Sequence, residues 1–404
     1  MKRLTVAACL FLFICPALSQ IAGYPDFEIV ESTPVGTILD NPDVRDARDV
    51  WLEMINGAKT SLDIEEFYVA NQPGEPLDDI IRAVVAAGER GVRVRLIADS
   101  RMYRTYPETV DMLGKQKNIT SRVIDFGKIA GGVQHAKYFI VDGEEVFLGS
   151  QNFDWRALKH IHEIGVRIRH REAAANYQEV FNLDWEMAAK NAPIPPAQKR
   201  IAVPYKVVEG DGDTLLFSPT MSPIGLIPDS SRWDESNIVG LIDGASTTVS
   251  CQFLTYSPVA RDKSYYRVLN DALRRAAARG VRVKMIVSDW SKDHPTVDSL
   301  KLLSRTPNIE LKFSDIPEFS GGYISFARVE HCKYLVADTD RAWIGTSNAE
   351  KSYFTTTRNV GVVVTSPKIA GILGAIFRKD WDGPYTEAIT PQGTYTPREH
   401  GERK

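Results

Sequence analysis

One short pattern of polar residues occurs twice in this chain, and this repeat constrains the fold more than any other feature. Each copy holds a histidine, a lysine, an aspartate, a glycine and an asparagine at identical spacings: His135, Lys137, Asp142, Gly149 and Asn152, then His331, Lys333, Asp338, Gly345 and Asn348. The same offset relates Trp185 to Trp381 near the end of each copy. A chain of 404 residues also exceeds the size of most single cores. We therefore expect two domains that derive from one duplicated ancestor.

Both halves show the same order of expected helices and strands. Residues 77–90 and 266–279 carry apolar residues at helical spacing and end at Gly91 and Gly280, as helices commonly do. The apolar runs after these glycines are typical of buried strands in an α/β sheet. The sequence therefore predicts an α/β fold class, with two similar α/β/α sandwich domains packed face to face around one shared active site.

Composition and turn signals give the expected domain boundaries. A signal peptide is expected over 1–19, the first domain over 20–195 and the second over 213–390. The Pro-rich break and the turn cluster between them predict a linker over 196–212. Residues 391–404 are rich in Pro, Gly and charge, so we expect a polar tail that adds no core.

The N-terminus has the pattern of a secretory signal. Lys2 and Arg3 precede an apolar run over 4–18, and small residues at 17 and 19 offer a cleavage site before Gln20. The run is too short to span a bilayer comfortably. We therefore expect a secreted or extracytoplasmic protein, located in the periplasm, the extracellular space or a lysosome-like lumen.

Charge and cysteine content exclude several classes of protein. The formal net charge is −3, so a strongly basic nucleic-acid or membrane module is excluded and any anion site must be locally focused. Of the four cysteines, only Cys251 and Cys332 lie outside the signal, which excludes a disulfide-dense scaffold and a four-cysteine zinc site. We expect both to be buried free thiols, with a single bridge as the alternative. The sequence does not indicate an oligomeric state.

The spacing within the first copy predicts how its side chains point. A strand expected over 133–141 places His135 and Lys137 on one face, because residues two apart along a strand share a face. Asp142 has the opposite parity, so its expected position is that of a structural partner near the hairpin turn. A returning strand over 146–148 then brings Asn152 back beside His135, where its amide can donate to a phosphate oxygen.

The second copy predicts the same arrangement and completes the site. A pseudo-twofold axis would place His135 and His331 on opposite sides of one phosphorus, with the lysines and asparagines around its charged oxygens. The structural alternative is that both histidines are ordinary core residues without a catalytic role. A matching pattern in both halves of a repeat makes coincidence negligible, so we interpret the residues as a phosphodiester site.

The segment His135-x-Lys137-x4-Asp142-x6-Gly149-Ser150-x-Asn152 resembles the signature of the phospholipase D superfamily, and the second copy resembles it equally. The resemblance covers nearly all of the mature chain. The residues after Asn152 and Asn348 are most similar to the lysosomal phospholipase D-like proteins of animals. This resemblance implies 5′-exonuclease cleavage of single-stranded DNA or RNA.

The resemblance also implies a mechanism and a set of site residues. His135 would attack phosphorus and form a phosphohistidine, and His331 would protonate the leaving oxygen. The signature counts Asp142 and Asp338 in the catalytic motif alongside the lysines, and Asn152, Asn348, Ser150 and Ser347 would bind substrate. No metal or other cofactor is expected, because Lys137 and Lys333 supply the positive charge.

One asymmetry between the copies favours this assignment of roles. Glu163 and Asn359 occupy equivalent positions after the two motifs. In the superfamily, a carboxylate at this spacing hydrogen-bonds the nucleophilic imidazole and fixes its tautomer. We therefore expect Glu163 to bind His135 and to stabilise its charged phosphohistidine, with Asn359 as the supporting neighbour of His331.

Two other functions use the same scaffold. A phospholipase D or phosphatidyl transferase acting on phospholipid head groups would share the phosphohistidine step and would need exposed apolar loops around the site. Residues 221–227 are the candidate loop, unless they pack between the domains. A non-catalytic binding protein is disfavoured because the reacting residues are intact in both copies. His160 and His162 have no evident third metal ligand, and we expect them on the surface or in supporting positions.

Overall fold

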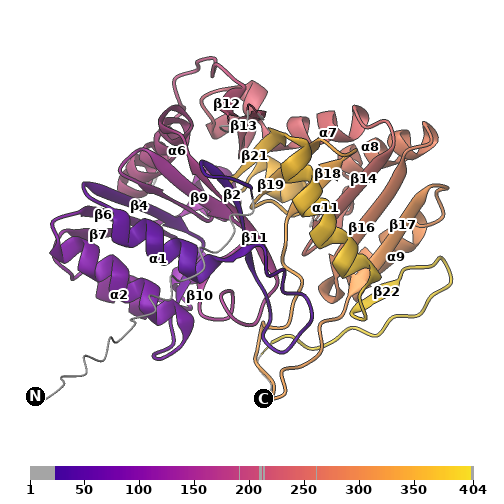
Figure 1. Cartoon of the computed structure of the whole chain (residues 1–404), viewed down its shortest axis with the longest axis horizontal. Helices are drawn as coiled ribbons and strands as arrows, with labels where there is room; N and C mark the ends of the chain where they lie inside the picture. Colours follow the sequence, from indigo (N-terminus) through magenta and orange to yellow (C-terminus); the bar gives the residue numbers. More distant parts are fainter. Residues whose placement is uncertain (1–22, 191, 209–211, 213, 261, 402–404) are drawn as a thin grey trace, which may run out of the picture.

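The computed structural model describes residues 23–401 except 191, 209–211, 213 and 261, and shows two α/β halves side by side (Figure 1). The expected signal peptide over 1–19 lies outside the described residues. Each half is built on one large mixed sheet, with helices on both faces. The predicted α/β fold class with two similar sandwich domains is confirmed.

The first sheet has the strand order β1-β2-β11-β9-β8-β4-β6-β7. Its central strands β4 and β6 run parallel, and the hairpin of β8 and β9 carries the first copy of the motif. The bounds are β1 (Gly23–Tyr24), β2 (Phe27–Ser32), β4 (Ser61–Glu66), β6 (Arg93–Asp99), β7 (Ile119–Ile124), β8 (Tyr138–Val141), β9 (Glu145–Gly149) and β11 (Glu163–Arg169). The short β3 (Arg45–Asp46) pairs with β2, and β5 (Val69–Ala70) pairs with β10 (Phe153–Asp154).

The second sheet repeats this order as β12-β13-β21-β19-β18-β14-β16-β17-β22. Seven consecutive strands correspond one to one with those of the first sheet, from β13 matching β2 to β17 matching β7. The bounds are β12 (Tyr205–Val208), β13 (Thr214–Ser222), β14 (Thr248–Phe253), β16 (Arg282–Ser288), β17 (Ile309–Ser314), β18 (Tyr334–Ala337), β19 (Arg341–Gly345), β21 (Asn359–Thr365) and β22 (Thr386–Ala388). Two short strands, β15 (Tyr256–Ser257) and β20 (Ala349–Glu350), form a separate pair. The matching topology supports the expected duplication.

Helices cover the outer face of each sheet. In the first half these are α1 (Ala47–Gly57) and α2 (Pro76–Glu89), and in the second α7 (Asp234–Asp243), α8 (Val268–Ala278) and α9 (Thr296–Leu303). Proline at its first position starts α2, and the residues after α2 and α8 turn at Gly91 and Gly280, whose φ angles of +99° and +90° suit glycine. The connecting segments contain the short helices α3 (Ser100–Tyr103), α4 (Glu108–Leu113), α5 (Phe126–Ala130) and α10 (Lys351–Thr355), and 3₁₀ turns at Ile224–Leu226, Ser230–Arg232 and Asp289–Lys292.

The inner helices join the two halves. α6 (Arg171–Lys190) and α11 (Pro367–Asp382) bury Phe181 and Phe377 in one apolar cluster, which also contains residues of both sheets. Each half keeps a separate outer cluster under its own outer helices. Because the inner core is shared, burial of apolar surface holds the halves in a fixed relation. The site between them is therefore built on rigid elements.

Two expectations about connecting segments need correction. The predicted linker over 196–212 contains β12, which pairs with β13 and so belongs to the second sheet. The predicted tail also adds packing, because Tyr395 contacts Phe313 with ring centroids 5.0 Å apart and lies against the outer core. Neither segment contains enough apolar residues in a regular pattern to predict these contacts. The contacts form only when the second domain has folded. The other domain bounds stay predictions.

Cys251 and Cys332 are buried free thiols, as expected. Within the described residues, no helix combines the length and apolar character that crossing a bilayer requires.

Candidate active site

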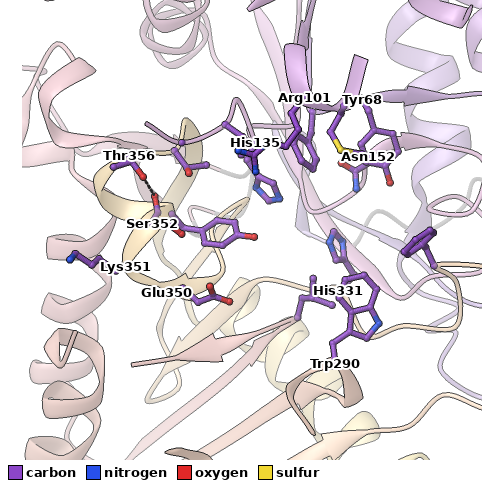
Figure 2. A pocket seen from close by; sticks show the side chains of 18 of the residues that line it. Tyr68, Arg101, His135, Asn152, Trp290, His331, Glu350, Lys351, Ser352 and Thr356 are labelled. Atoms are coloured by element: carbon purple, nitrogen blue, oxygen red, sulfur yellow. Dashed lines mark hydrogen bonds between the residues drawn. The ribbon is translucent and has the colours of Figure 1, made fainter. Parts of the chain in front are cut away.

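Both motif histidines line one cavity between the two halves. The cavity has a volume of about 760 Å³, and His135, Asn152 and His331 contribute to its wall. Figure 2 shows both imidazole rings entering the same hollow, with Asn152 beside them and Trp290 below His331. The predicted convergence of the two motifs on one site therefore agrees with the geometry.

Each histidine is held by the backbone of the opposite half. His135 N donates to Arg358 O at 3.0 Å, and His331 N donates to His162 O at 2.9 Å. The expected strand over 133–141 therefore begins only at Tyr138. The sequence expectation was wrong here because Val133, Gln134 and His135 pair with Arg358 of the second half.

The side-chain partners of the two histidines are exchanged between the halves in the same way. Glu163 Oε2 accepts from His331 Nδ1 at 2.7 Å, and Asn359 Oδ1 lies 3.1 Å from His135 Nδ1. The expected pairing of Glu163 with His135 is thus wrong. β11 begins at Glu163 and β21 begins at Asn359, and the first residue of each strand lies at the interface. Each strand therefore places its first side chain next to the other domain's histidine.

The surroundings of Asn359 fix the tautomer of His135. Asn359 Nδ2 donates to Tyr353 O at 2.8 Å and Thr357 O at 3.3 Å, so its Oδ1 must face the imidazole. That oxygen can only accept, which places the proton of His135 on Nδ1. Nε2 of His135 is therefore left to exchange a proton inside the cavity.

Glu163 is completely buried, and its carboxyl group forms a hydrogen bond with His331. Burial raises the pKa of Glu163 to about 8, although Lys333 and Lys137 oppose that rise. Burial, followed by Lys333 and Lys137, lowers the pKa of His331 well below its ordinary value. When Glu163 is ionised, the neutral imidazole directs its Nδ1–H to the carboxylate and carries a free lone pair on Nε2, as a nucleophile requires.

The two motif lysines are fully buried beside the histidines. Lys137 Nζ donates to His135 O at 2.5 Å and Lys333 Nζ to His331 O at 2.7 Å, so each ammonium is fixed beside its own motif histidine. Burial lowers the pKa of Lys333 to about 8 and that of Lys137 well below its ordinary value. A bound phosphate diester would restore the missing anionic partner.

The two asparagines present amide groups without a protein partner. Asn348 is fully buried, and neither its Nδ2 nor its Oδ1 makes a hydrogen bond within the described residues. Asn152 lines the cavity with its Oδ1 unpaired in that part of the chain. Unpaired buried amides are costly, so their retention here favours a ligand that completes their hydrogen bonds.

Ser150 and Ser347 do not reach the cavity. Ser150 Oγ accepts from Ile164 N at 3.0 Å and donates to Ile164 O, while Ser347 Oγ donates to the buried Asp234 at 2.9 Å. Both side chains are fully buried. The expected substrate-binding role is wrong for both, because the backbone after β9 and β19 turns these serines into the core.

Asp142 and Asp338 lie away from the reacting groups, as their parity predicted. Asp142 caps the start of β4, where its carboxylate accepts from the backbone N–H groups of residues 59–61 at 2.7 to 3.2 Å. Asp338 does the same for residues 246–248. Their inclusion in the catalytic motif reflects a structural role at the hairpin turn.

Sequence reasoning missed most of the cavity wall. The rings of Tyr68 and Tyr106 stack with centroids 5.2 Å apart, and Arg156 lies over Tyr106 and over Phe326 of the second half. The rings of Trp290 and Phe326 meet edge to face, with their centroids 6.5 Å apart. These aromatic side chains are not repeated at equivalent positions in the other half, so the duplication could not have pointed to them.

Comparison with known proteins agrees with this geometry. Residues 51–185 and 238–381 match the family described as "Cardiolipin synthase, PLD-like domain". The chain is similar to "5'-3' exonuclease PLD3" of Bos taurus, at 30% identity over 89% of this chain and 80% of that protein. It is also similar to "Phospholipase D Z" of Dictyostelium discoideum, at 29% identity over 90% of each chain. The solved structure of phosphatidylserine synthase from Haemophilus influenzae Rd KW20 has the same fold, with a TM-score of 0.63 at 14% identity over 92% of this chain and 88% of that one.

Proposed function

The chain belongs to the phospholipase D-like family of phosphodiesterases, and we propose that it is an exonuclease that cleaves single-stranded DNA or RNA from the 5′ end. The observation that carries this proposal is the aromatic wall beside the two histidines. Bases can stack on such rings only when they are unpaired, and stacking tolerates any sequence. Arg101 and Lys351 line the same cavity and can contact a polyanionic backbone.

The alternative phospholipid substrate has less support. The candidate apolar loop over 221–227 buries Met221, Leu226 and Ile227, and two of these pack with Val180 of α6. Ile224 is exposed but does not line the cavity. Large exposed apolar side chains are otherwise scattered, and Phe326 is the one that lines the cavity among the described residues. A lipid enzyme needs a continuous apolar rim, which these positions do not supply.

The crossed hydrogen bonds suggest the roles of the two histidines. In this proposal His331 is the nucleophile, because the Glu163 carboxylate beside it stabilises the positive charge of a phosphohistidine. Nε2 of His331 forms a bond to phosphorus as the bond from phosphorus to the leaving oxygen breaks, and His135 gives that oxygen a proton. His135 then takes a proton from water, whose oxygen attacks phosphorus and releases His331.

Four polar side chains support the charged oxygens during both steps. Asn152 lines the cavity, while Lys137, Lys333 and Asn348 are fully buried, the lysines beside the two motif histidines. In this proposal each of the four side chains donates to a phosphoryl oxygen. Because phosphorus gains negative charge on these oxygens in the transition state, fixed donors lower the barrier.

A side-by-side assay tests the substrate. Single strands labelled at the 5′ or the 3′ end, a circular single strand, a duplex and phosphatidylcholine vesicles would be incubated separately with the protein. We expect loss of nucleotides from the 5′ end and resistance of the circle and the duplex. Cleavage of the circle would overturn the exonuclease assignment. Choline release without cleavage of any nucleic acid would favour the phospholipid alternative.

Secretion forms a separate part of the proposal. It is supported by the basic N-terminus, the apolar run over 4–18 and the small residues before Gln20. N-terminal sequencing of the protein recovered from its native source is expected to begin at Gln20. A chain that retains Met1 and stays in the cytosol would contradict it.

A further inference from the structure

His162 occupies a buried carboxylate cluster directly behind the proposed nucleophile. Its Nε2 lies 3.0 Å from Glu31 Oε1 and its Nδ1 lies 2.9 Å from Glu330 Oε2. Asp380 lies 3.7 Å from the same Nδ1. The imidazole is fully buried, and both carboxylates it contacts are at most 3% exposed. The expectation that His162 lies on the surface or in a supporting position therefore resolves in favour of a supporting position.

The contacts of the ring select its charged form. Both nitrogens face carboxylate oxygens, and only an imidazolium has two N–H donors. A neutral ring would direct a lone pair at Glu31 or Glu330 in a buried environment. Burial alone would lower the pKa of His162, but Cys332, Glu330 and Asp380 outweigh it and hold the pKa well above the ordinary value.

The repeat provides an independent comparison. The position equivalent to His162 in the other half is Arg358, also fully buried, which pairs with Asp184 through two hydrogen bonds of 2.6 and 2.7 Å. His162 directly precedes Glu163, which contacts His331, and the backbone oxygen of His162 accepts from the backbone N–H of His331. Arg358 likewise precedes Asn359, which contacts His135, and the backbone oxygen of Arg358 accepts from the backbone N–H of His135. Both halves thus place a buried cation at the same point, but one of the two can lose its proton.

We propose that His162 is a positioning residue for the reaction: its imidazolium, clamped between Glu31 and Glu330, holds the strand end that presents Glu163 to His331. This rests on the proposed role of His331. The clamp joins three segments, because Glu31 belongs to β2, His162 precedes β11 and Glu330 precedes the second motif. Loss of the proton would therefore release Glu163 and His331 together.

The titratable groups that face His162 come from all sides of the cluster. They are Glu31, Glu330, Cys332 and Asp380, with Tyr334 held nearby through Gln252. The pKa of Asp380 is raised to about 7, first by burial, while His162 lowers the pKa of Glu330. Donor atoms of His162, Glu330 and Cys332 also lie within 4.8 Å of one another. Both ring nitrogens already face carboxylates, so the cluster is interpreted as a charge clamp.

The test compares pH profiles of kcat for wild type, His162→Gln and His162→Arg on a single-stranded substrate. Deprotonation of His135 alone lowers log kcat by about one unit per pH unit. The wild type is expected to fall more steeply at alkaline pH, and His162→Arg to remove the extra steepness. His162→Gln is expected to lose roughly ten- to a hundredfold in kcat at neutral pH with little change in KM. Arg358→Lys is the matched control and should keep the wild-type alkaline slope.

A second measurement does not depend on folding of the variants or on activity. Nitrogen-15 NMR of the wild-type protein, labelled at its seven histidines, reports whether His162 carries two N–H protons. An imidazolium at pH 7 that titrates above the ordinary histidine range supports the clamp even if no substrate is turned over. A neutral His162 at pH 7, or a zinc ion bound to it, would overturn the proposal. Equal kcat profiles for wild type and folded His162→Gln would overturn it too.

Discussion

Glu163, from the first half of the chain, accepts a hydrogen bond of 2.7 Å from Nδ1 of His331 in the second half. His135 has only the neutral Asn359 in the equivalent place. Two histidines in one repeat therefore have different electrostatic surroundings. This difference, and not the motif itself, distinguishes the proposed nucleophile from the proposed acid.

The assignment of the nucleophile can be tested by trapping the intermediate. With bis(p-nitrophenyl) phosphate the leaving group needs no acid, so His135→Asn should still form a phosphohistidine but hydrolyse it slowly. Mass spectrometry is expected to find the phosphoryl adduct on His331. Glu163→Gln should lower kcat by roughly 10²–10⁴-fold, as loss of an orienting carboxylate does in a catalytic triad. An adduct on His135 in the His331→Asn protein would reverse the roles.

The reaction is expected to lose kcat at alkaline pH. Burial, followed by Lys137 and Lys333, lowers the pKa of His135 well below its ordinary value. The protonated acid form of His135 is therefore depleted as pH rises, and above pH 8 further ionisation of Glu163, whose pKa is about 8, no longer offsets that loss. Above pH 8, Lys333 loses its charge, since its pKa is about 8, and KM should increase. Steady-state kinetics across pH would check both, and a kcat maximum above pH 8 would contradict the role of His135.

Activity is expected to survive chelation. In the proposed mechanism, Lys137 and Lys333, each held beside a motif histidine, supply the positive charge that stabilises the phosphoryl oxygens. Turnover measured after dialysis against EDTA should equal that of untreated protein, with a magnesium-dependent nuclease as the control in the same buffer. Loss of activity that returns on adding Mg²⁺ or Zn²⁺ would remove the metal-independent mechanism.

Asp142→Asn should affect stability and leave the chemistry intact. Its carboxylate accepts several backbone hydrogen bonds at the start of β4, and these lower its pKa against the opposing effect of burial. The substitution is expected to reduce the free energy of unfolding by about 1–3 kcal/mol. The wild-type contribution is present above the unfolded pKa near 4 and declines as pH falls. Denaturant unfolding gives the first value, and an unchanged kcat per folded molecule checks the second point.

The aromatic wall should act on binding of nucleic acid and not on the phosphoryl step. Phe326 lines the cavity and is 41% exposed, so Phe326→Ala removes a stacking surface at little cost in stability. We expect KM for a single strand to rise by roughly five- to a hundredfold. Hydrolysis of bis(p-nitrophenyl) phosphate should stay unchanged. Leu302→Ala, at an exposed site outside the cavity, is the matched control.

The repeat made the fold and the central residues predictable. His135, Lys137, His331 and Lys333 could be found because one pattern recurs with conserved spacing, and the parity of Asp142 correctly removed it from the reacting set. These conclusions depend on local geometry and on the equivalence of the halves. Both are encoded in short stretches of sequence.

The partners of the histidines could not be obtained in this way. Equivalent positions in a repeat show that Glu163 and Asn359 perform related tasks, but not whether each serves its own half or the other. That depends on the interface, where the two chain segments exchange hydrogen bonds. The cavity loops with Tyr106 and Phe326 differ between the halves, so only the assembled structure places them together.

The exchange of strand ends across the interface has an evolutionary consequence. A symmetric homodimer of one ancestral domain must put the same residue beside both of its imidazoles, since its subunits are identical. Once two copies are fused in a single polypeptide, each position can diverge from its counterpart, as Glu163 has from Asn359 and His162 from Arg358. Two copies in one polypeptide can therefore give their imidazoles different roles, which two identical subunits cannot do in a symmetric dimer.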